Sequence, residues 1–346
     1  MTGSSEQAAF EARLRLQIEA YHAAALAYAA VKLGLPDRMG ERAWTAEQLA
    51  GELGLSPPHL FRFLRALVTL GICQELPDGG FTLAAGGWSL RSDSHSRLAK
   101  KVQIVVEQYW QPWSDLISCL KTGQPSFEQV FGASVWDWRS RHPEQGALFE
   151  SYLTGETFDQ AGPIVEVFEF AAGVASVADI GGGCGGLLAA LLIAYPRLDG
   201  ALLDRPHIIE MARAFLRAFD AFRLTERIEF VPGDFFAGIP IEADLYLLKG
   251  VLQQWDDQAA TAILTNCRNA MSGAARLAVI ERLMPARAGD DPSAVMVDLH
   301  MMTITGGRTR SVAEFEALLA PAGLALAKVT PTRLGLAIVE AVRSSP

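Results

Sequence analysis

Apolar residues in the first part of the chain recur with the spacing of an amphipathic helix. Residues 7–31 are rich in Ala, Leu and Glu and contain neither Gly nor Pro, a composition that favours helix. The apolar positions that recur at helical spacing are Leu14, Ile18, Tyr21 and Ala25. The pattern predicts one long helix with an apolar face.

Two shorter helices are predicted next. Thr45 and Gln48 have the spacing of a capping box before a helix that Gly54 ends, and Ser56-Pro57 begins a second helix. The apolar side of the second helix carries Leu60, Phe63, Leu64 and Leu67. Two short helices joined by a Gly turn predict a helix-turn-helix.

A hairpin follows, because residues 72–75 and 81–83 have strand-like patterns and flank the turn Asp78-Gly79-Gly80. Together with the two helices, this hairpin predicts a winged helix, a fold that suggests DNA binding. Residues 1–100, however, contain ten Lys or Arg and ten Asp or Glu. The region therefore lacks the excess of positive charge that DNA binding requires.

Residues 101–170 are predicted to be helical and are rich in aromatic side chains. These are Tyr109, Trp110, Trp113, Trp136, Trp138, Tyr152 and Phe158. Large aromatics supply apolar area to a core, and a minority could instead line a pocket for a flat organic ligand. The pattern leaves both interpretations open.

From residue 174 short aliphatic runs alternate with helical stretches. The predicted strands are 174–180, 200–203, 228–231, 243–248, 276–280, 324–329 and 336–341. This alternation predicts an α/β domain with a doubly wound, mostly parallel sheet.

Length, charge and cysteine content narrow the class of protein. A chain of 346 residues, half of them hydrophobic, is longer than one core usually holds, so two domains are expected. A net charge of −9 disfavours nonspecific electrostatic binding to nucleic acid or anionic lipid. The four cysteines are far apart without a CxxC pair, which predicts no disulfide framework and no metal site and fits a reducing cytoplasm. Neither a signal peptide nor an apolar run of about eighteen residues is expected.

A glycine-rich loop, residues 181–186, follows the first strand of the α/β domain and leads directly into a helix. Glycines let the backbone approach a nucleotide closely, and one strand later the Asp204 carboxylate could accept from two ribose hydroxyls. Asp234 closes the next strand, where it could accept from an adenine amine while Phe235 covers the ring. The GxGxxG spacing alone does not separate a dinucleotide from S-adenosylmethionine.

In combination and order, the motifs of this region resemble those of the two-domain, plant-type small-molecule O-methyltransferases and their bacterial relatives from antibiotic and pigment pathways. The resemblance covers nearly the whole chain. It rests on Val177-Ala178-Asp179-Ile180-Gly181-Gly182-Gly183, Leu203-Asp204-Arg205-Pro206-His207, Gly233-Asp234-Phe235-Phe236, Tyr246-Leu247-Leu248-Lys249, Trp255-Asp256-Asp257 and Gly306-Gly307.

The resemblance implies a Rossmann-like methyltransferase domain preceded by a winged-helix dimerisation domain. It divides the chain into the dimerisation domain (1–105), a helical connector that lines the substrate pocket (106–170) and the cofactor-binding domain (171–346). The implied cofactor is S-adenosylmethionine, with S-adenosylhomocysteine as its product. The expected partners are a second copy of the chain and a hydrophobic small molecule, without nucleic acid or membrane.

Residue roles follow from the same resemblance. Gly181 and its neighbours cradle the methionine part of the cofactor, Asp204 binds ribose, and Asp234 with Phe235 holds adenine. The full set of implied cofactor residues is Asp179, Gly181, Gly183, Asp204, Arg205, Asp234, Phe235, Lys249 and Thr157. The residues expected to contact substrate are Trp110, Leu153, Gln254, Met301 and Thr309.

The predicted catalytic centre departs from the family pattern. Many members have His-Asp before the tryptophan that follows the fourth strand, and this histidine removes the proton of the substrate hydroxyl. Here Gln253-Gln254 stands in its place, and an amide cannot accept a proton at neutral pH. Thr309 replaces a flanking glutamate, so only Glu281 remains of the trio.

Three interpretations of this departure stay open. Methyl transfer can rest on proximity, which contributes up to ~7–11 kcal/mol, especially for an acceptor already ionised near pH 7. His300 could act as a substitute base, although a lone histidine among apolar residues is more often structural. Alternatively, a repurposed enzyme with this fold catalyses hydroxylation, decarboxylation or cyclisation. The predicted function is O-methylation of an aromatic or polyketide-like secondary metabolite, with Gln253 and Glu281 orienting the acceptor.

Overall fold

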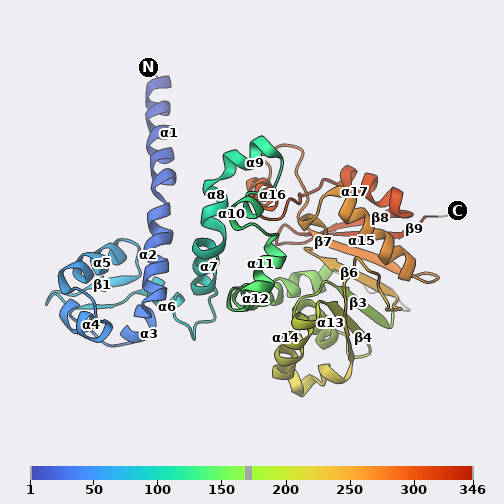
Figure 1. Ribbon diagram of the computed structural model, residues 1–346, viewed down its shortest axis with the longest axis horizontal. Helices are drawn as coiled ribbons and strands as arrows, with labels where there is room; N and C mark the ends of the chain where they lie inside the picture. Colours follow the sequence, from blue (N-terminus) through green and yellow to red (C-terminus); the bar gives the residue numbers. More distant parts are fainter. Residues whose placement is uncertain (1, 168–173, 345–346) are drawn as a thin grey trace. The chain divides into compact units, whose positions relative to one another are not determined.

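The computed structural model describes residues 2–167 and 174–344 and divides into two compact units, Met1–Gln111 and Pro112–Pro346 (Figure 1). The predicted connector, 106–170, crosses this division, and its residues 168–170 lie outside the described residues, as do 171–173 of the predicted third domain. The three-part division stays a prediction. No helix within the described ranges is long and apolar enough to cross a membrane.

The first unit begins with two helices where the hydrophobic pattern predicted one. α1 spans Thr2–Glu19 and α2 spans Tyr21–Lys32. Between them, the Ala20 N–H donates to the carbonyl of Gln17, three residues back instead of four. The apolar spacing continues through this turn, and alanine is the strongest helix former. The prediction of a single helix over 7–31 is therefore wrong. The helix is interrupted at Ala20, and helix propensity gives no indication of this interruption.

The predicted helix-turn-helix is present. α4 (Ala46–Leu53) begins with both hydrogen bonds of the Thr45–Gln48 capping box and ends at Gly54, whose φ of +66° is left-handed. α5 (Pro57–Thr69) follows. The predicted wing is also present, because β1 (Cys73–Glu75) pairs antiparallel with β2 (Phe81–Leu83).

Four further elements complete the helical part of this unit. They are α3 (Leu35–Met39), α6 (Ala85–Ser89), α7 (Leu98–Ile104) and a π-helical turn, η1 (Val105–Tyr109). α8 (Trp110–Ser114) contains the division between the units. The core of the first unit joins Leu60, Leu64 and Leu67 of α5 to Phe81 of the hairpin.

The second unit is built on a seven-stranded sheet. Its strands are β3 (Ser176–Ile180), β4 (Asp199–Asp204), β5 (Ile228–Pro232), β6 (Leu245–Lys249), β7 (Arg276–Glu281), β8 (Leu324–Pro331) and β9 (Ala337–Arg343), in the order β5-β4-β3-β6-β7-β9-β8. β9 pairs antiparallel with both β7 and β8, and it is the one strand in the described sheet that runs against the others. The seven predicted strands and the mostly parallel sheet are confirmed.

Helices surround this sheet. Those that precede it are α9 (Leu116–Thr122), α10 (Ser126–Phe131), α11 (Val135–Arg141) and α12 (Pro143–Val167); those that follow its strands are α13 (Gly186–Ala194), α14 (Pro206–Leu216), α15 (Asp257–Ala270), α16 (Pro292–Ile304) and α17 (Val312–Leu319). A 3₁₀ turn, η4 (Leu252–Gln254), follows β6. The helical character predicted for residues 101–170 is confirmed over its described part.

The central strands contribute to two cores, because successive side chains point to opposite faces of the sheet. On one face, Val177 of β3 and Leu247 of β6 pack with apolar residues of α12, α13 and α14. On the other face, Ala178 and Tyr246 pack with α15 and α17. Figure 1 shows these two groups of helices on either side of the strands. Burial on both faces fixes the strand register and hence the positions of the loops beyond it.

Candidate functional site

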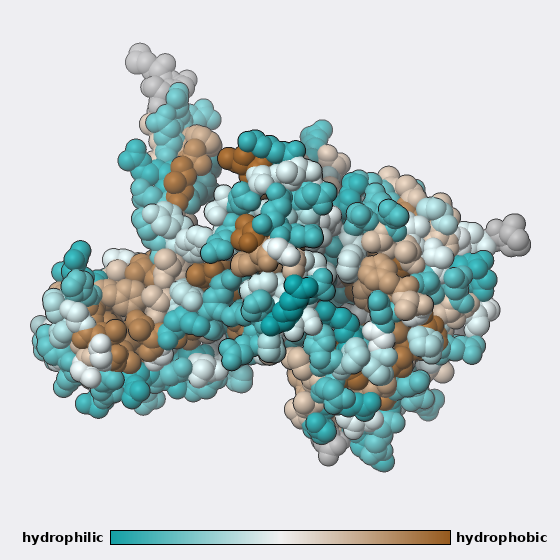
Figure 2. All heavy atoms as spheres, viewed as in Figure 1, coloured by the Kyte–Doolittle hydropathy of each residue, from teal (hydrophilic) through white to brown (hydrophobic). Residues whose placement is uncertain are grey.

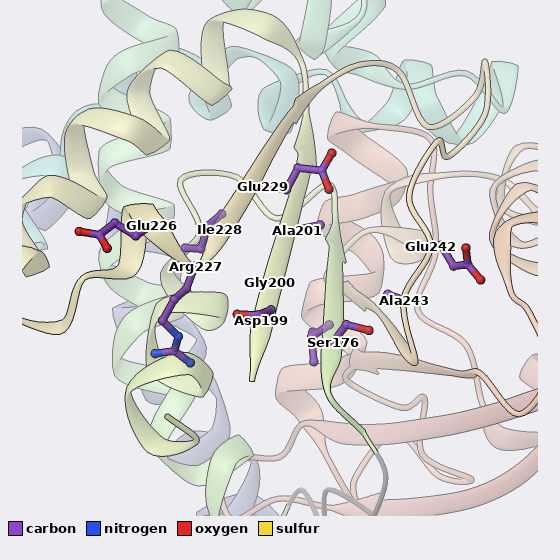
Figure 3. Close-up of a pocket in the computed structure, with 11 residues that line it drawn as sticks. Ser176, Asp199, Gly200, Ala201, Glu226, Arg227, Ile228, Glu229, Glu242 and Ala243 are labelled. Carbon is purple, nitrogen blue, oxygen red and sulfur yellow. The ribbon is translucent and has the colours of Figure 1, made fainter. Parts of the chain in front are cut away.

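Polar residues gather at the edge where the parallel strands end. Asp204 ends β4, Lys249 ends β6 and Glu281 ends β7, while the glycine-rich loop follows β3. In open α/β sheets this edge is where ligands bind. Figure 3 shows an open hollow at the opposite edge, lined by the first residues of β3, β4 and β5. None of the predicted site residues lines that hollow.

The glycine-rich loop lies directly on the end of β3. Gly181 and Gly183 have φ values of +67° and +59°, which residues with side chains rarely adopt. A Cβ on Gly182 would lie 2.5 Å from the Asp179 carboxylate and 2.6 Å from Cδ1 of Leu202. The loop therefore presents backbone atoms, without side chains, to a ligand bound at this edge of the sheet.

Asp179 is an unusual neighbour for this loop, because its carboxylate is 1 % exposed and neither oxygen has a hydrogen-bond partner among the described residues. Burial raises the pKa of Asp179 to about 7; the Asp204 charge adds to this rise and Lys249 opposes it. A buried carboxylate without a donor costs free energy. A ligand that brings a donor or a positive charge would reduce that cost.

Asp204 is held in place by two backbone N–H groups. Gly183 donates to Oδ2 over 2.9 Å and Arg205 donates to Oδ1 over 2.7 Å. Burial raises the pKa of Asp204, and these two hydrogen bonds oppose the rise. Each carboxylate oxygen keeps a lone pair for a further donor. The Arg205 guanidinium lies 5.7 Å from the ring centre of Trp136.

Lys249 and Thr157 meet, although they are far apart in the sequence. The Lys249 ammonium donates to the Thr157 hydroxyl over 3.3 Å. Burial lowers the pKa of Lys249, while the nearby carboxylates of Glu156, Asp179 and Glu281 raise it. Lys249 thus lies between the acid beneath the glycine loop and the acid at the end of β7.

The adenine residues predicted from the family lie after β5. The Phe235 ring would be 3.3 Å from a Cβ on Gly181, so it packs against the glycine loop. The exposed Asp234 accepts from the Phe236 N–H over 2.8 Å. The Asn266 side chain donates to the carbonyls of Phe235 and Phe236, over 2.8 and 3.0 Å, and so fixes this turn.

An aromatic cluster continues from this turn. The Trp255 ring contacts Phe235 and Phe236 edge-on and stacks on Trp136 at 6.2 Å between ring centres. Such pairs rigidify a wall against which a flat ring can stack. Trp255 belongs to a motif of the resembled family, but no role was predicted for it. No feature of the sequence predicts that Trp136 packs against Trp255.

Glu281 supports the backbone at Gln253. Its Oε1 accepts from the Gln253 N–H over 2.9 Å, and its Oε2 has no partner among the described residues. The side chain is 1 % exposed, and burial raises the pKa of Glu281 to about 7. The Gln254 amide donates to the Gly250 carbonyl over 2.6 Å, so its nitrogen is engaged within the loop.

Arg310 fixes the same loop and was not anticipated from the sequence. Its guanidinium is fully buried and donates to the carbonyls of Leu252 and Trp255 and to the Asp257 carboxylate. A Cβ on Gly307 would collide with the Gln253 carbonyl. Arginine is rarely buried unless paired, so sequence reasoning would place it on the surface.

Thr309, predicted to contact substrate, is buried. Its backbone N–H donates to the Asp298 carboxylate over 2.7 Å, and its hydroxyl oxygen has no partner among the described residues. Its contact with a substrate stays a prediction.

His300 contacts Trp113. The Trp113 indole N–H donates to Nδ1 of His300 over 3.1 Å, and the two rings stack. An indole nitrogen only donates, so Nδ1 is the acceptor and the proton of the neutral ring is on Nε2. In this arrangement Nδ1 is not available to take a substrate proton, and Nε2 already carries one.

The other predicted substrate residues lie in different parts of the chain. Leu153 on α12 and Met301 on α16 are half-buried in the second unit. Trp110 belongs to the first unit, where its ring meets Tyr21 edge-on at 6.4 Å. Their contact with a substrate stays a prediction.

Comparison with known proteins assigns both parts of the chain. Residues 113–325 match the family profile of the O-methyltransferase domain, and residues 17–92 match that of the O-methyltransferase dimerisation domain. The phenazine O-methyltransferase of Lysobacter antibioticus is 34 % identical over 315 residues, which cover 91 % of each chain.

Solved structures agree. The structure of a mitomycin 7-O-methyltransferase matches with a TM-score of 0.91 and 35 % identity and covers 99 % of this chain and 100 % of that one. An O-methyltransferase from neocarzinostatin biosynthesis, in complex with S-adenosylmethionine and 2-hydroxy-5-methyl naphthoic acid, matches with a TM-score of 0.79 and 32 % identity and covers 93 % of this chain and 96 % of that one.

Asp179 and Asp244 are expected to affect stability in opposite directions. The raised pKa of Asp179 means that folding loses stability as pH rises from the ordinary carboxyl range to about 7, so Asp179→Asn should be more stable than wild type at pH 8 and similar to it near pH 4. Asp244 accepts from two backbone N–H groups and the Ser176 hydroxyl, which lower its pKa.

The matched variant Asp244→Asn should therefore be less stable than wild type at pH 8, and this difference should shrink as pH falls through the lowered pKa of Asp244. Urea unfolding of the ligand-free proteins between pH 4 and pH 8 measures both differences, and unfolding below pH 4 follows the loss of the Asp244 difference. Equal destabilisation by both substitutions would contradict the assignment of Asp179 as an uncompensated charge.

Proposed function

Since the chain belongs to the O-methyltransferase family, we propose that it transfers a methyl group from S-adenosylmethionine to a hydroxyl oxygen of an aromatic or polyketide-like secondary metabolite. The observation that carries the proposal is the gathering of Asp179, Asp204, Lys249 and Phe235 around the bare backbone of the glycine loop. Because the loop leaves no space for side chains, Asp179 lacks a donor and Asp204 keeps lone pairs available, these residues fit a nucleoside with hydroxyl and ammonium groups.

S-adenosylmethionine, when bound, supplies a methyl group on a positively charged sulfur. Asp204 accepts from the ribose hydroxyls with the lone pairs that Gly183 and Arg205 leave available. Phe235 covers the adenine, and Asn266 keeps the turn that carries it in place. The buried carboxylates favour a positively charged ligand over a neutral one.

The acceptor oxygen loses its proton before or outside the transfer step. Glu281 accepts from the Gln253 backbone with Oε1 and has its Oε2 enclosed by protein, Gln253 is an amide, and the neutral ring of His300 carries its proton on Nε2. The site therefore suits an acceptor that is already ionised at neutral pH, such as a hydroxyquinone or an acidic enol. The chain then contributes alignment and the exclusion of water.

Flat polycyclic compounds are the favoured acceptors. The relatives named above act, by their names, on phenazine and mitomycin compounds, and one structure holds a naphthoic acid. Trp113 and His300 provide stacked rings, and the half-buried Met301 follows on the same helix. Nothing in the described residues favours the alternative of a repurposed hydroxylase, decarboxylase or cyclase.

The enzyme acts as a homodimer in the cytoplasm. All residues of α1 whose side chains are described are exposed, and they include Phe10, Leu14 and Ile18. Figure 2 shows brown, hydrophobic side chains along this helix. A helix of this length without packing is marginal in water, so we assign its apolar face to a second copy. The four free, buried cysteines suit a reducing compartment.

Cofactor binding is tested by calorimetric titration with S-adenosylmethionine and S-adenosylhomocysteine, with NAD as a control ligand. We expect micromolar binding of the two sulfur compounds and none of NAD. Asp204→Ala should weaken binding by at least ~1 kcal/mol, because the ribose loses a charged partner. The matched variant Asp199→Ala, at the exposed beginning of the same strand, should bind as wild type does. Failure of the wild-type protein to bind either sulfur compound would refute the proposed cofactor.

The role of Gln253 is tested with two acceptors, a hydroxyquinone that is ionised at pH 7 and a simple phenol with a pKa of about 10. Gln253→Ala should lower kcat on the hydroxyquinone only modestly. Gln253→His should raise kcat on the phenol by about tenfold or more, since a positioned base contributes about 10²–10⁴, without helping the hydroxyquinone. Complete loss of turnover in Gln253→Ala would mean that the amide takes part directly in the chemistry.

The dimer is tested by light scattering after gel filtration. Ile18→Asp places a charge on a side chain that is 65 % exposed in the single chain, and it should convert a dimer into a monomer. Leu334→Asp, at a position that is 39 % exposed in the second unit, is the control and should leave the mass unchanged. A dimer that persists in Ile18→Asp would place the interface elsewhere.

A further inference from the structure

One face of α12 lies against the glycine loop and is polar. Glu150, Thr154 and Thr157 follow one another at helical spacing. A Cβ on Gly186 would be 3.2 Å from the Thr154 carbonyl and 3.6 Å from Cγ2 of Thr157, and a Cβ on Gly183 would be 3.9 Å from Oε2 of Glu150. Helix faces buried against a protein core are ordinarily apolar, so this face requires an explanation.

The two threonines have local partners. The Thr154 hydroxyl donates to the Glu150 carbonyl over 2.7 Å, and the Thr157 hydroxyl accepts from Lys249. Glu150 is different: its side chain is 8 % exposed, and no hydrogen bond to its carboxylate is found among the described residues. Neither of its oxygens is fully enclosed by protein.

The charges that act on Glu150 come from three different parts of the chain. Burial raises the pKa of Glu150 to about 7, and the Asp204 carboxylate at the end of β4 adds to this rise. Arg139 on α11 and Arg205 before α14 oppose it. Burial raises the pKa of the Cys184 thiol in the loop, and the Glu150 and Asp204 charges add to this rise. Two carboxylates thus repel each other around one glycine.

This arrangement lowers the folding stability of the ligand-free protein. A buried carboxylate without a donor is unfavourable, and a like charge beside it adds to the cost. Residues that cost stability in this way are typical of binding sites. Asp204 already accepts from the Gly183 N–H, and Oε2 of Glu150 lies near the same residue. A ligand with two neighbouring hydroxyl donors would satisfy both acids.

We propose that Glu150 is a cofactor-binding residue that, together with Asp204, accepts hydrogen bonds from the ribose hydroxyls of the cofactor. The assignment rests on the proposed function, because it takes the glycine loop as the S-adenosylmethionine site. The other predicted cofactor residues that follow the strands come from motifs at the sheet edge. Glu150 would add a residue from the helix α12, which lies outside the sheet.

The test compares three variants by calorimetric titration at pH 8 with S-adenosylmethionine and with 5′-methylthioadenosine, which keeps the ribose and lacks the amino-acid part. Glu150→Gln should weaken both ligands alike, by about three- to tenfold, because a neutral acceptor replaces a charged one. Glu150→Ala removes the acceptor and should weaken both further. The control Glu144→Gln, at the exposed start of the same helix, should bind both as wild type does.

Thermal unfolding of the ligand-free variants separates binding from a structural role. If Glu150 serves the cofactor, Glu150→Gln should unfold at the same or a higher temperature than wild type at pH 8 while its affinity falls. A lower unfolding temperature together with unchanged affinity would make Glu150 structural and overturn the proposal.

The remaining outcomes are also decisive. Weaker S-adenosylmethionine with unchanged 5′-methylthioadenosine would move Glu150 to the amino-acid part of the cofactor and overturn the ribose assignment. Unchanged affinity for both ligands would remove Glu150 from the site and leave the proposed function intact. Absence of binding in the wild-type protein would instead refute the proposed function itself.

Discussion

The hydrogen bond from the Gly183 backbone to the Asp204 carboxylate joins the two parts of the site that must keep a fixed separation. It connects the loop after β3 to the end of β4, and the register of these parallel strands puts both at one edge. The left-handed Gly183 and the absence of space above Asp179 leave the loop few alternative conformations. Because the loop is fixed, Phe235 can pack on it, and α12 can approach from the other side.

A second constraint holds the acceptor half of the site. Arg310 donates hydrogen bonds to two carbonyls of the turn after β6, and Glu281 accepts a hydrogen bond from the Gln253 N–H. Both groups are buried charges that serve backbone atoms, so their loss would leave carbonyl and amide groups without partners. Gln253, which is predicted to face the acceptor, is therefore positioned through its backbone by Glu281 and Arg310. This separation explains how the residue at 253 can differ from the family's histidine while the turn keeps its shape.

Sequence reasoning succeeded where a motif lies on a strand end. The glycine loop, Asp204 and Lys249 were predicted to lie together because each follows or ends a predicted strand. In a parallel sheet the carboxyl ends of these strands meet at one edge. It failed for partners supplied by distant helices: Trp113 and His300 are 187 residues apart, and Glu150, Trp136 and Asn266 belong to no motif. Arg310 was missed because a buried guanidinium looks like a surface residue, and the break at Ala20 because alanine carries no signal for it. These contacts depend on packing geometry, which spacing does not encode.

Gly307 has a consequence for the engineering of this enzyme. Any side chain there would displace the turn that carries Gln253, so position 307 offers no route to new acceptors. Gln253 lies on a turn whose backbone is held by Glu281 and Arg310 independently of the Gln253 side chain. A mutant library that varies 253 and keeps 307 as glycine would thus preserve the backbone of this turn, whereas one that includes 307 would distort it.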